Sequence, residues 1–536
     1  MKKGLFIGAV ALVVAGGVGF AAIRFLEQPS EDAAISLIPA DAYVYGNLFI
    51  QPSGDQKRAL DDLLGSFPRI ESTDQAINRL TGFLDEELEE NGLSYDEDVD
   101  PWLGDQVSFF LNGTEIDPPD GAGLLETTDP AAAADTLDKI REIEDSPEPE
   151  QRSYEGVDYE IEDSGEDVPI AIGFVDDFLV IGTENGFKSV VDSSQGSTEG
   201  LADSDEYESA FEGLEDQNIL SVFLDQTRLF DLLGESGQLG GPETAVFNAF
   251  PGLRSAGIAG FVLSARSDGL AFQSSSSVPD EGVPPLAGIY GGTDLIRELP
   301  GDSWVALGIP NLGETVSALI ETISEMPGAE TASEQATAAF KQETGLDLEE
   351  DVLSWMGDAA LFVQGTNFQE MGGGVIVESS DPDATKSALT ALRARIEREQ
   401  VPTSDEERGG LEGFSIQAGL PAPIFALAGD RLVVTYGENA TDGAIDPDET
   451  LGDDATYQAA EGALGDGYSP AFFVDLNGVF EVVEFAQAFS GQTDDTYEQE
   501  VKPWVDPLSY VIAGSRTDGD RLYQTFFVGV EAEESS

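Results

Sequence analysis

The sequence offers carboxylates as its main reactive groups. It holds 104 Asp and Glu against 25 Lys and Arg, and it contains neither His nor Cys. Without His the chain lacks the usual general base near neutral pH and the commonest transition-metal ligand, so a Ser-His-Asp triad is excluded. Without Cys, disulfides, thiolate nucleophiles and zinc–thiolate sites are excluded too. Acid–base catalysis by paired carboxylates, as in glycoside hydrolysis, is what remains.

Two pairs of aspartates are the best candidates for such catalysis, because each pair has one member in each half of the chain. Asp105 and Asp358 follow a Gly, and Asp41 and Asp302 precede an aromatic run. Turn formation explains Asp at these places at least as well. We therefore assign no catalytic residue.

Calcium is the ion that an acidic chain would favour, since hard cations take several oxygen ligands. Asp96, Asp98 and Asp100 stand at alternate positions, as the ligands of an EF-hand loop do, but Pro101 replaces the required Gly. No Gly-rich phosphate or dinucleotide motif occurs either. We expect no metal site and no cofactor, only diffuse cation binding.

Two further pairs of residues occur at matching places in the two halves of the chain, and each pair could either contact a ligand or have a structural role. Arg266 and Arg516 lie in "RSDG" and "RTDG", where they could clamp an anionic ligand or pair with surface carboxylates. Trp102 and Trp355 lie in "DPWLGD" and "LSWMGD", where they could contact a ligand or anchor the core. The structural alternative is favoured for both pairs.

The elements around these residues are ordinary helix and strand signals. Acidic stretches before each Trp predict a short helix, which Gly104 and Gly357 should end in the left-handed conformation. Asp129 and Asp381 precede Pro, as N-cap residues do. The "RSDG" and "RTDG" stretches predict a hairpin at the end of each half, with the serines of 274–277 inside a strand.

The same blocks occur twice in the same order, which predicts a tandem duplication. The matched blocks begin at Leu37 and Glu298, Glu97 and Glu350, Thr127 and Ser379, Asp176 and Gly429, Leu201 and Leu451, and Ser264 and Gly514. The predicted fold class is α+β, with two tandem homologous repeats, each mainly an antiparallel sheet with packed amphipathic helices. The predicted segments are a signal-anchor at 1–30, repeat 1 at 31–280, a Pro/Gly-rich linker at 281–297, and repeat 2 with a short acidic tail at 298–536.

The N-terminus predicts export. Lys2 and Lys3 precede an uncharged run from Gly4 to Ile23, close to the roughly 20 residues that span a bilayer. The basic flank should stay in the cytoplasm, so the rest of the chain should lie outside it. Two alternatives stay open: an uncleaved signal-anchor, giving a single-pass membrane protein, and a cleaved signal peptide, giving a secreted one.

The formal net charge of −79 restricts the partners. Such a field repels nucleic acid and anionic lipid headgroups, so binding to either is not expected. Salt would screen the self-repulsion, so adaptation to a saline habitat and a generic acidic exported protein are both open.

The order of these blocks resembles a known bacterial family. An "LP-x-D" start before an aromatic strand, then "EEDVLSWMGD", then "VESSDP" before a helix, is similar to domain of unknown function family 3352. The resemblance implies an N-terminal hydrophobic segment and the architecture above. It implies no activity and no functional residue.

The sequence therefore predicts a membrane-anchored, extracytoplasmic binding or envelope-associated protein without enzymatic activity. Its partners would be the membrane, through the N-terminal helix, and an apolar ligand or an envelope protein. A His-free hydrolase that works through carboxylates is the alternative.

Overall fold

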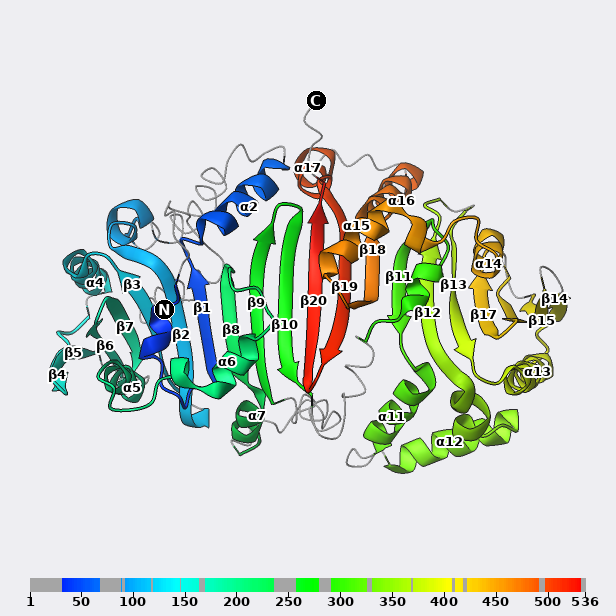
Figure 1. Ribbon diagram of the computed structural model, residues 1–536, viewed down its shortest axis with the longest axis horizontal. Coiled ribbons are helices and arrows are strands. Elements are labelled where there is room, and N and C mark those ends of the chain that lie inside the picture. The colour runs from blue at the N-terminus through cyan, green and yellow to red at the C-terminus, as the bar shows by residue number, and fades with distance from the viewer. Residues whose placement is uncertain are drawn as a thin grey trace. The chain divides into compact units, whose positions relative to one another are not determined.

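The computed structural model describes the chain from residue 31 onward, with gaps. The described residues are 31–67, 88, 92–116, 119–144, 146–162, 169–235, 257–278, 291–324, 330–367, 370–406, 410–417, 422–490 and 497–531. They fall into two compact units, unit 1 up to Ser277 and unit 2 from Val278 (Figure 1). The predicted signal-anchor at 1–30 lies outside the described residues. Within them, no helix is long and apolar enough to cross a membrane.

Unit 1 is built on a ten-stranded antiparallel sheet. Its strands are β1 (Val44–Phe49), β2 (Leu103–Ile116), β3 (Pro119–Thr127), β4 (Glu150–Tyr154), β5 (Val157–Glu162), β6 (Ile170–Val175), β7 (Phe178–Thr183), β8 (Leu220–Asp225), β9 (Ile258–Arg266) and β10 (Gly269–Ser277). They pair in the order β4-β5-β6-β7-β3-β2-β1-β8-β9-β10.

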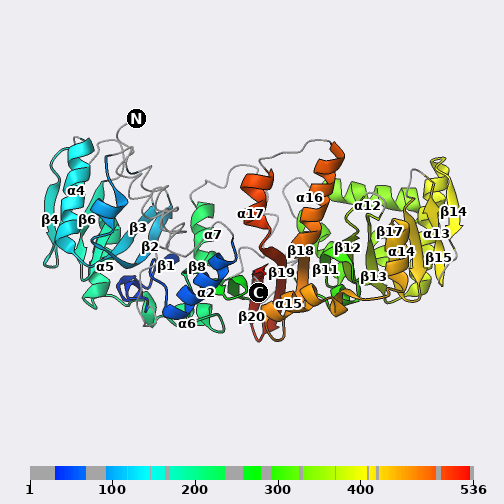
Figure 2. The ribbon, with the colours of Figure 1, turned by 90° about the horizontal axis from the view of Figure 1, so that it is seen from above.

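Short helices pack on both faces of this sheet. They are η1 (Ala34–Leu37), α2 (Gly54–Gly65), η2 (Tyr95–Val99), α4 (Pro130–Glu144), α5 (Glu184–Ser194), η3 (Leu201–Asp203), α6 (Asp205–Phe211) and α7 (Gln226–Glu235). Figure 2 shows α5 and α6 on one side of the sheet and α4 and α7 on the other.

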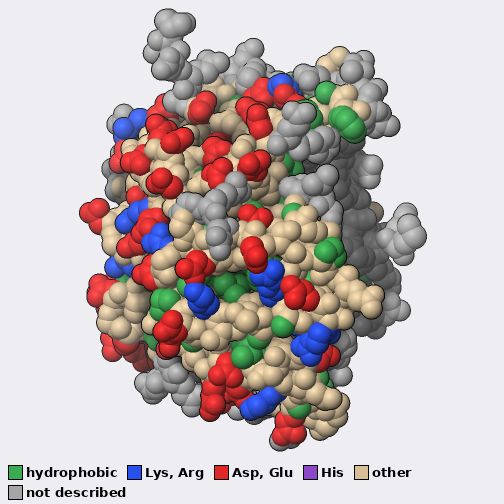
Figure 3. All heavy atoms as spheres, turned by 90° about the vertical axis from the view of Figure 1, so that its right-hand side faces the viewer, with side chains coloured by type: hydrophobic (Ala, Val, Ile, Leu, Met, Phe, Trp, Pro, Cys, Tyr) green, Lys and Arg blue, Asp and Glu red, His purple; other side chains and the backbone are tan. Residues whose placement is uncertain are grey.

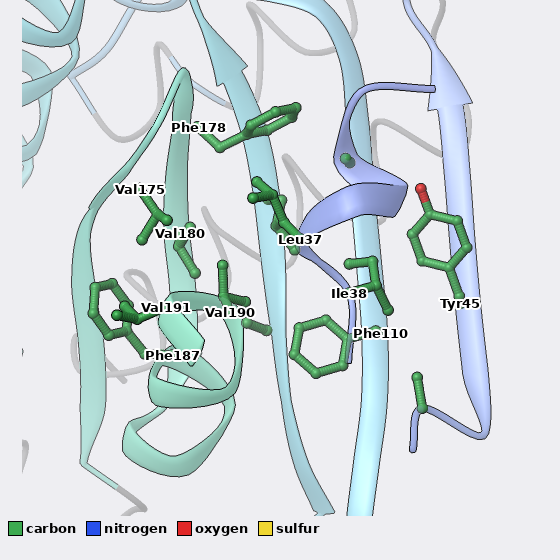
Figure 4. Packing of buried hydrophobic residues seen from close by; sticks show 14 of the residues in the cluster. Leu37, Ile38, Tyr45, Phe110, Val175, Phe178, Val180, Phe187, Val190 and Val191 are labelled. Atoms are coloured by element: carbon green, nitrogen blue, oxygen red, sulfur yellow. The ribbon is translucent and has the colours of Figure 1, made fainter. Parts of the chain in front are cut away.

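The larger core of unit 1 lies under η1, α5 and α6. Figure 4 shows Leu37 of η1 and the adjacent Ile38 near Phe110 of β2, and the hydroxyl of Tyr45 directed toward η1; Phe187, Val190 and Val191 of α5 belong to the same core. These side chains are almost completely buried. A second core on the opposite face holds Trp102 and the apolar side of α4.

Unit 2 has the same strand order as unit 1. Its strands are β11 (Ser303–Ile309), β12 (Met356–Gln364), β13 (Gly372–Ser379), β14 (Thr403–Glu406), β15 (Leu411–Ile416), β16 (Ile424–Ala428), β17 (Arg431–Tyr436), β18 (Ser469–Asp475), β19 (Leu508–Asp518) and β20 (Arg521–Val530). They pair antiparallel in the order β14-β15-β16-β17-β13-β12-β11-β18-β19-β20.

The helices of unit 2 again lie on both faces. They are η4 (Asp294–Glu298), α11 (Leu312–Ser324), α12 (Glu330–Thr344), η5 (Leu348–Val352), η6 (Leu353–Trp355), α13 (Pro382–Arg398), α14 (Glu438–Ile445), η7 (Leu451–Asp453), α15 (Ala455–Leu464), α16 (Leu476–Ser490), η8 (Tyr497–Val501) and α17 (Lys502–Val505). In Figure 2, α15 lies on one side of the sheet, and α12 and α16 on the other. The α+β class is confirmed; the tandem duplication stays a prediction.

Several local predictions are confirmed. The side chain of Asp129 accepts the backbone N–H groups of Ala131 and Ala132, as an N-cap does, and Asp381 caps α13 likewise. Arg266 pairs with Gly269 across the first predicted hairpin, and the serines of 274–277 lie in β10.

The predicted role of Gly104 and Gly357 is wrong. Both residues lie inside strands, β2 and β12, and neither has a positive φ. The preceding helical turns end before the Trp-x-Gly-Asp motif is complete, so no left-handed residue is needed there. Gly104 is required for another reason: a Cβ at this position would lie 2.7 Å from Cγ of Glu126 on β3.

Candidate binding surface

The central strands of unit 2 are apolar on both faces. One set of side chains is buried under α14 and α15: Phe362, Ala306, Phe473, Ile512 and Phe527, each at most 1% exposed. The alternating set lies side by side across six strands: Val375, Leu361, Leu307, Phe472, Ala513 and Phe526. An antiparallel sheet that is solvated on one face usually places polar residues there. This second face is apolar instead.

We call this second surface the α11/α16 face, after the two helices that contact it. Helix α11 contacts β12, and α16 contacts β11, β18 and β19. Together they cover the face only in part, because Leu361 is 37% exposed and Phe526 is 43% exposed. The face therefore carries apolar side chains that folding has not removed from water.

The two helices also expose apolar side chains of their own. Val483 of α16 is 37% exposed and Phe489 is 75% exposed, while Ile323 of α11 is 39% exposed. Among the described residues, seven of the nine large hydrophobic side chains that are exposed belong to unit 2. Contiguous exposed apolar surface marks binding sites more often than chance would. The exposed large hydrophobic side chains of the described residues are thus concentrated in unit 2.

The aspartates singled out in the sequence have structural roles. The carboxylate of Asp358 accepts hydrogen bonds from Thr293 Oγ1 at 2.5 Å and from the backbone N–H of Asn311 at 2.9 Å. Asp302 accepts from Gln364 Nε2 at 3.1 Å. Asp41 accepts from Asn112 Nδ2 at 3.2 Å. The bonds of Asp302 and Asp41 tie the start of one strand to the neighbouring strand, and those of Asp358 tie β12 to the N-cap of η4 and to the residue after Pro310.

Asp105 is the exception, because it lies beside a second carboxylate. The backbone N–H of Asp105 donates to Glu126 Oε2 at 2.9 Å. Burial raises the pKa of Asp105, and burial together with the charge of Asp105 raises the pKa of Glu126. The matching carboxylate in unit 2, Glu378, lies 3.7 Å from Arg431, whereas Glu126 pairs across the strands with Phe178. Unit 1 therefore has a carboxylate pair without the arginine.

Among the described residues, Asp32 is the carboxyl whose pKa is raised most, and sequence reasoning missed it. Tyr45 Oη donates to both of its oxygens, at 2.8 and 2.7 Å, and the backbone N–H of Ile35 donates to Oδ1 at 3.1 Å. Gln106 adds a side-chain N–H to Oδ1 at 3.2 Å. Burial raises the pKa of Asp32 to about 6, although these hydrogen bonds oppose the shift.

The surroundings of Asp32 tie the start of the described chain to the sheet of unit 1. Gln106 also contacts Asn47, which accepts a hydrogen bond from Ser108 at 2.6 Å. In unit 2 the positions that pair in the same way as Tyr45 and Asn47 are Ala306 and Gly308. The polar cluster is thus a property of unit 1 alone, and the shared strand order does not require it.

The two tryptophans anchor the core, as predicted. Trp102 is 4% exposed and Trp355 is 2% exposed. The Trp102 indole donates to the carbonyl of Asp98 at 2.6 Å, and the Trp355 indole donates to the carbonyl of Asp351 at 3.0 Å. Each indole therefore holds the helical turn that precedes it.

The two arginines are engaged within their own units. Arg266 donates to Glu215 from Nε at 3.0 Å and from Nη2 at 2.6 Å. Arg516 stacks over the rings of Tyr523, at 4.0 Å, and Tyr468, at 5.3 Å. These contacts fit the structural alternative rather than an anion clamp.

An open hollow of about 720 Å³ lies between α4 and β4 in unit 1. Arg141 lines it, and its guanidinium is held by Glu162 at 2.6 Å, Glu160 at 2.5 Å and Asp138 at 2.8 Å. Because this cation already has three carboxylate partners, the hollow offers little to an anionic ligand. The other charged residues that line it are all acidic.

The sequence does contain a pattern that indicates strands with two apolar faces in unit 2. The strands "VALGI", "ALFVQ" and "AFFVD" are apolar at consecutive positions rather than alternately. Such runs are typical of strands covered on both faces. Which side chains stay exposed depends on where α11 and α16 lie, and that requires the tertiary structure.

Comparison with solved structures gave seven matching chains, among them three crystal forms of a protein named TP0453. Form III is 10% identical, with a TM-score of 0.24, covering 47% of this chain and 81% of that one. Form I is 11% identical, with a TM-score of 0.22, covering 46% and 78%. Form IV is 11% identical, with a TM-score of 0.24, covering 46% and 80%. TM-scores this low carry no argument about fold or function.

Comparison with curated protein sequences gave no match. A family model matches residues 6–510, which takes in both units. The chain belongs to the family described as protein of unknown function DUF3352.

Proposed function

We propose that this chain is a membrane-anchored, extracytoplasmic binding protein without enzymatic activity, and that the α11/α16 face of unit 2 holds an apolar ligand. The observation that carries the proposal is the apolar character of both sheet faces in unit 2, with Leu361 and Phe526 still 37% and 43% exposed. Covering such side chains is worth about 25 cal/mol per Å² of apolar surface removed from water. A bound ligand would gain this free energy, because folding leaves these side chains partly exposed to water.

The anchored location rests on the sequence. An uncharged run from Gly4 to Ile23, long enough to span a bilayer, follows two lysines that should stay in the cytoplasm. A duplicated origin of the two units is part of the proposal. It is supported by the shared strand order and by the matching positions of Trp102 and Trp355.

The test is saturable binding of a neutral alkyl glycoside to the full chain in nanodiscs of neutral phospholipid, with binding to empty discs subtracted. Leu361→Ser and Phe526→Ser should each weaken binding about tenfold, since each removes on the order of 1.4 kcal/mol of apolar contact. Ile143→Ser on α4 is the matched control, because Ile143 is 42% exposed in unit 1. Equal loss in the control variant, or no saturable binding, would refute the proposal.

The carboxylate hydrolase is a second candidate, favoured by the raised pKa values of Asp105 and Glu126. Hydrolysis would need both carboxyls to face a bound sugar. The hydrogen bond from the Asp105 amide to Glu126 accounts for their closeness without catalysis. Glycosidase activity that Glu126→Gln abolishes, in protein that is still folded, would establish this candidate instead.

A further inference from the structure

Asp32 ties the first described segment of unit 1, residues 31–38, to the sheet. Tyr45 Oη donates to both oxygens of its carboxylate, at 2.8 and 2.7 Å, and the backbone N–H of Ile35 donates to Oδ1 at 3.1 Å. Gln106 adds a side-chain N–H at 3.2 Å. Because Tyr45 is 0% exposed and Gln106 is 2% exposed, these donors lie inside the fold. Figure 3 shows a different situation at one side of unit 2, where Asp and Glu lie at the surface with Lys and Arg beside them.

The segment that Asp32 begins is packed against unit 1 by its apolar side chains. Leu37 is 4% exposed and Ile38 is 0% exposed, and both belong to the larger core. At the far end of the segment, the carbonyl of Ile38 accepts the backbone N–H of Leu201 at 2.8 Å. Asp32 is a polar attachment at the other end, which follows the predicted signal-anchor at 1–30. A change in how Asp32 binds therefore acts where that anchor would join unit 1.

The hydrogen bonds around Asp32 can accommodate a proton. Ser108 Oγ hydrogen-bonds with Tyr45 and donates to Asn47 Oδ1 at 2.6 Å. When Asp32 is ionised, it accepts from Tyr45. When it is protonated, it can donate to Tyr45 Oη, and Tyr45 can donate to Ser108 Oγ in turn. Asn47 still accepts at the end of this chain, so the protonated form satisfies the same groups without an ionised carboxylate inside the fold.

The titratable groups around Asp32 come from three elements. Tyr45 of β1 and Tyr207 of α6 have pKa values that burial raises above the ordinary 10, so both stay neutral from pH 4 to pH 8. Glu126 of β3 hydrogen-bonds with Gln106, and burial raises the pKa of Glu126 too. Among the described residues of this cluster, Asp32 and Glu126 are therefore the groups whose charge changes in weak acid.

The corresponding segment of unit 2 is capped by a group that does not titrate. Pro39 and Pro300, which follow η1 and η4, each form an isolated bridge to the strand-free stretch before the next short helix. At the start of η4, Thr293 Oγ1 accepts the backbone N–H of Leu295 at 3.2 Å, as Asp32 accepts a backbone N–H at the start of η1. A hydroxyl carries no charge near neutral pH. An ionisable cap is thus a feature of unit 1 that this kind of attachment does not require.

We propose that Asp32 is a pH-sensitive latch, which holds residues 31–38 tightly against the sheet of unit 1 when it is protonated and less tightly when it is ionised. Keeping an ionised carboxylate inside the fold costs free energy, and release of the segment into water recovers that free energy. Each released residue would add about 3.3 Å to the tether between unit 1 and the predicted anchor at 1–30. The latch is independent of the α11/α16 face.

Hydrogen exchange of the full chain in nanodiscs of neutral phospholipid tests the latch. It would be followed by mass spectrometry from pH 4 to pH 8, with correction for the intrinsic exchange rate at each pH. Burial raises the pKa of Asp32 from 3.8 to about 6. Opening of residues 33–38 should therefore rise about tenfold per pH unit from about pH 4 to pH 6 and level off above that.

The same experiment separates local release from unfolding of the whole unit. Residues 33–38 should exchange faster than the core strand β7 at every pH, because the segment opens while the sheet stays folded. Equal protection of the segment and of β7 would mean that residues 33–38 leave only when unit 1 unfolds. That result would overturn the latch.

Three variants assign the effect to Asp32. Asp32→Asn should abolish the pH dependence, because its amide carries no charge. Glu31→Gln is the matched control, since Glu31 is exposed and adjacent, and it should keep the dependence. Tyr45→Phe removes a hydrogen bond that favours ionised Asp32, so it should move the midpoint to higher pH. A dependence that persists in Asp32→Asn would assign the effect to another group, such as Glu126, and would overturn the proposal.

Discussion

At the scale of single residues, Asp32 is the group whose state can change near neutral pH. Burial raises its pKa to about 6, although hydrogen bonds from Tyr45 and from the backbone of η1 oppose the shift. The folded protein therefore holds a proton on Asp32 more tightly than the unfolded chain, whose ordinary value is 3.8. Asp32 stabilises the fold most when it is protonated.

The sign of the pH dependence follows from this difference. Between about pH 4 and pH 6 the folded state binds more protons at Asp32 than the unfolded state, so rising pH lowers the free energy of unfolding. We predict that Asp32→Asn, which stays neutral, gains stability relative to the wild type as pH rises from 4 to 7. The gain should reach at most about 3 kcal/mol, at 1.36 kcal/mol per pKa unit. Denaturant unfolding of both proteins at each pH measures it, and a difference that does not change with pH would contradict it.

Sequence reasoning could not single out Asp32 among 104 acidic residues. Its raised pKa depends on burial in the folded chain, where its neighbours include Tyr45 and Gln106, 13 and 74 positions further along, which β1 and β2 bring to it. The capping role of Asp129 and Asp381, by contrast, was predictable, because a cap contacts only the next two or three residues.

At the scale of elements, Trp-x-Gly-Asp is a junction between a helical turn and a strand. The packing of Trp102 and Trp355 followed from the sequence, since a large apolar residue beside a helical turn is usually buried. The role of Gly104 could not be predicted in this way. Glycine fits at this position because Glu126 on the neighbouring strand lies close to it, and not because a helix ends there.

The two glycines of the motif provide a matched pair for mutation. In Gly104→Ala the new Cβ would lie 2.9 Å from Cβ of Glu126 and 3.1 Å from its carbonyl carbon. In Gly357→Ala the nearest atom, the carbonyl oxygen of Glu378, is 3.4 Å away. We predict a loss of about 1–3 kcal/mol for the first variant and within about 0.5 kcal/mol of wild type for the second. Chemical denaturation measures both, and equal losses would show that the close contact is not the cause.

At the scale of the whole molecule, the charge of −79 opposes the compact state. The buried cores of unit 1 and the strands of unit 2 that are apolar on both faces offset this repulsion. The α+β class and the antiparallel strands could be predicted from the periodicity of the sequence. The exposed part of the α11/α16 face could not, since it depends on how far each helix extends over the sheet.

Screening should therefore stabilise the protein. We predict that the free energy of unfolding rises as NaCl is increased from 0.1 M to 1 M, while the Debye length falls from about 10 Å to about 3 Å. Choline chloride at the same ionic strength should act alike, because the effect is screening and not specific cation binding. Full stability in dilute buffer, with no gain from salt, would exclude adaptation to a saline habitat.

The central claim is that the α11/α16 face binds an apolar chain, and photo-crosslinking tests it most directly. The full chain in nanodiscs of neutral phospholipid would be labelled with an alkyl diazirine, and the labelled residues identified by mass spectrometry. The account predicts labelling on β12, β20, α11 and α16, around Leu361, Phe526, Ile323 and Phe489, which excess unlabelled alkyl glycoside prevents. Labelling that is spread over both units, or that the competitor does not prevent, would contradict it.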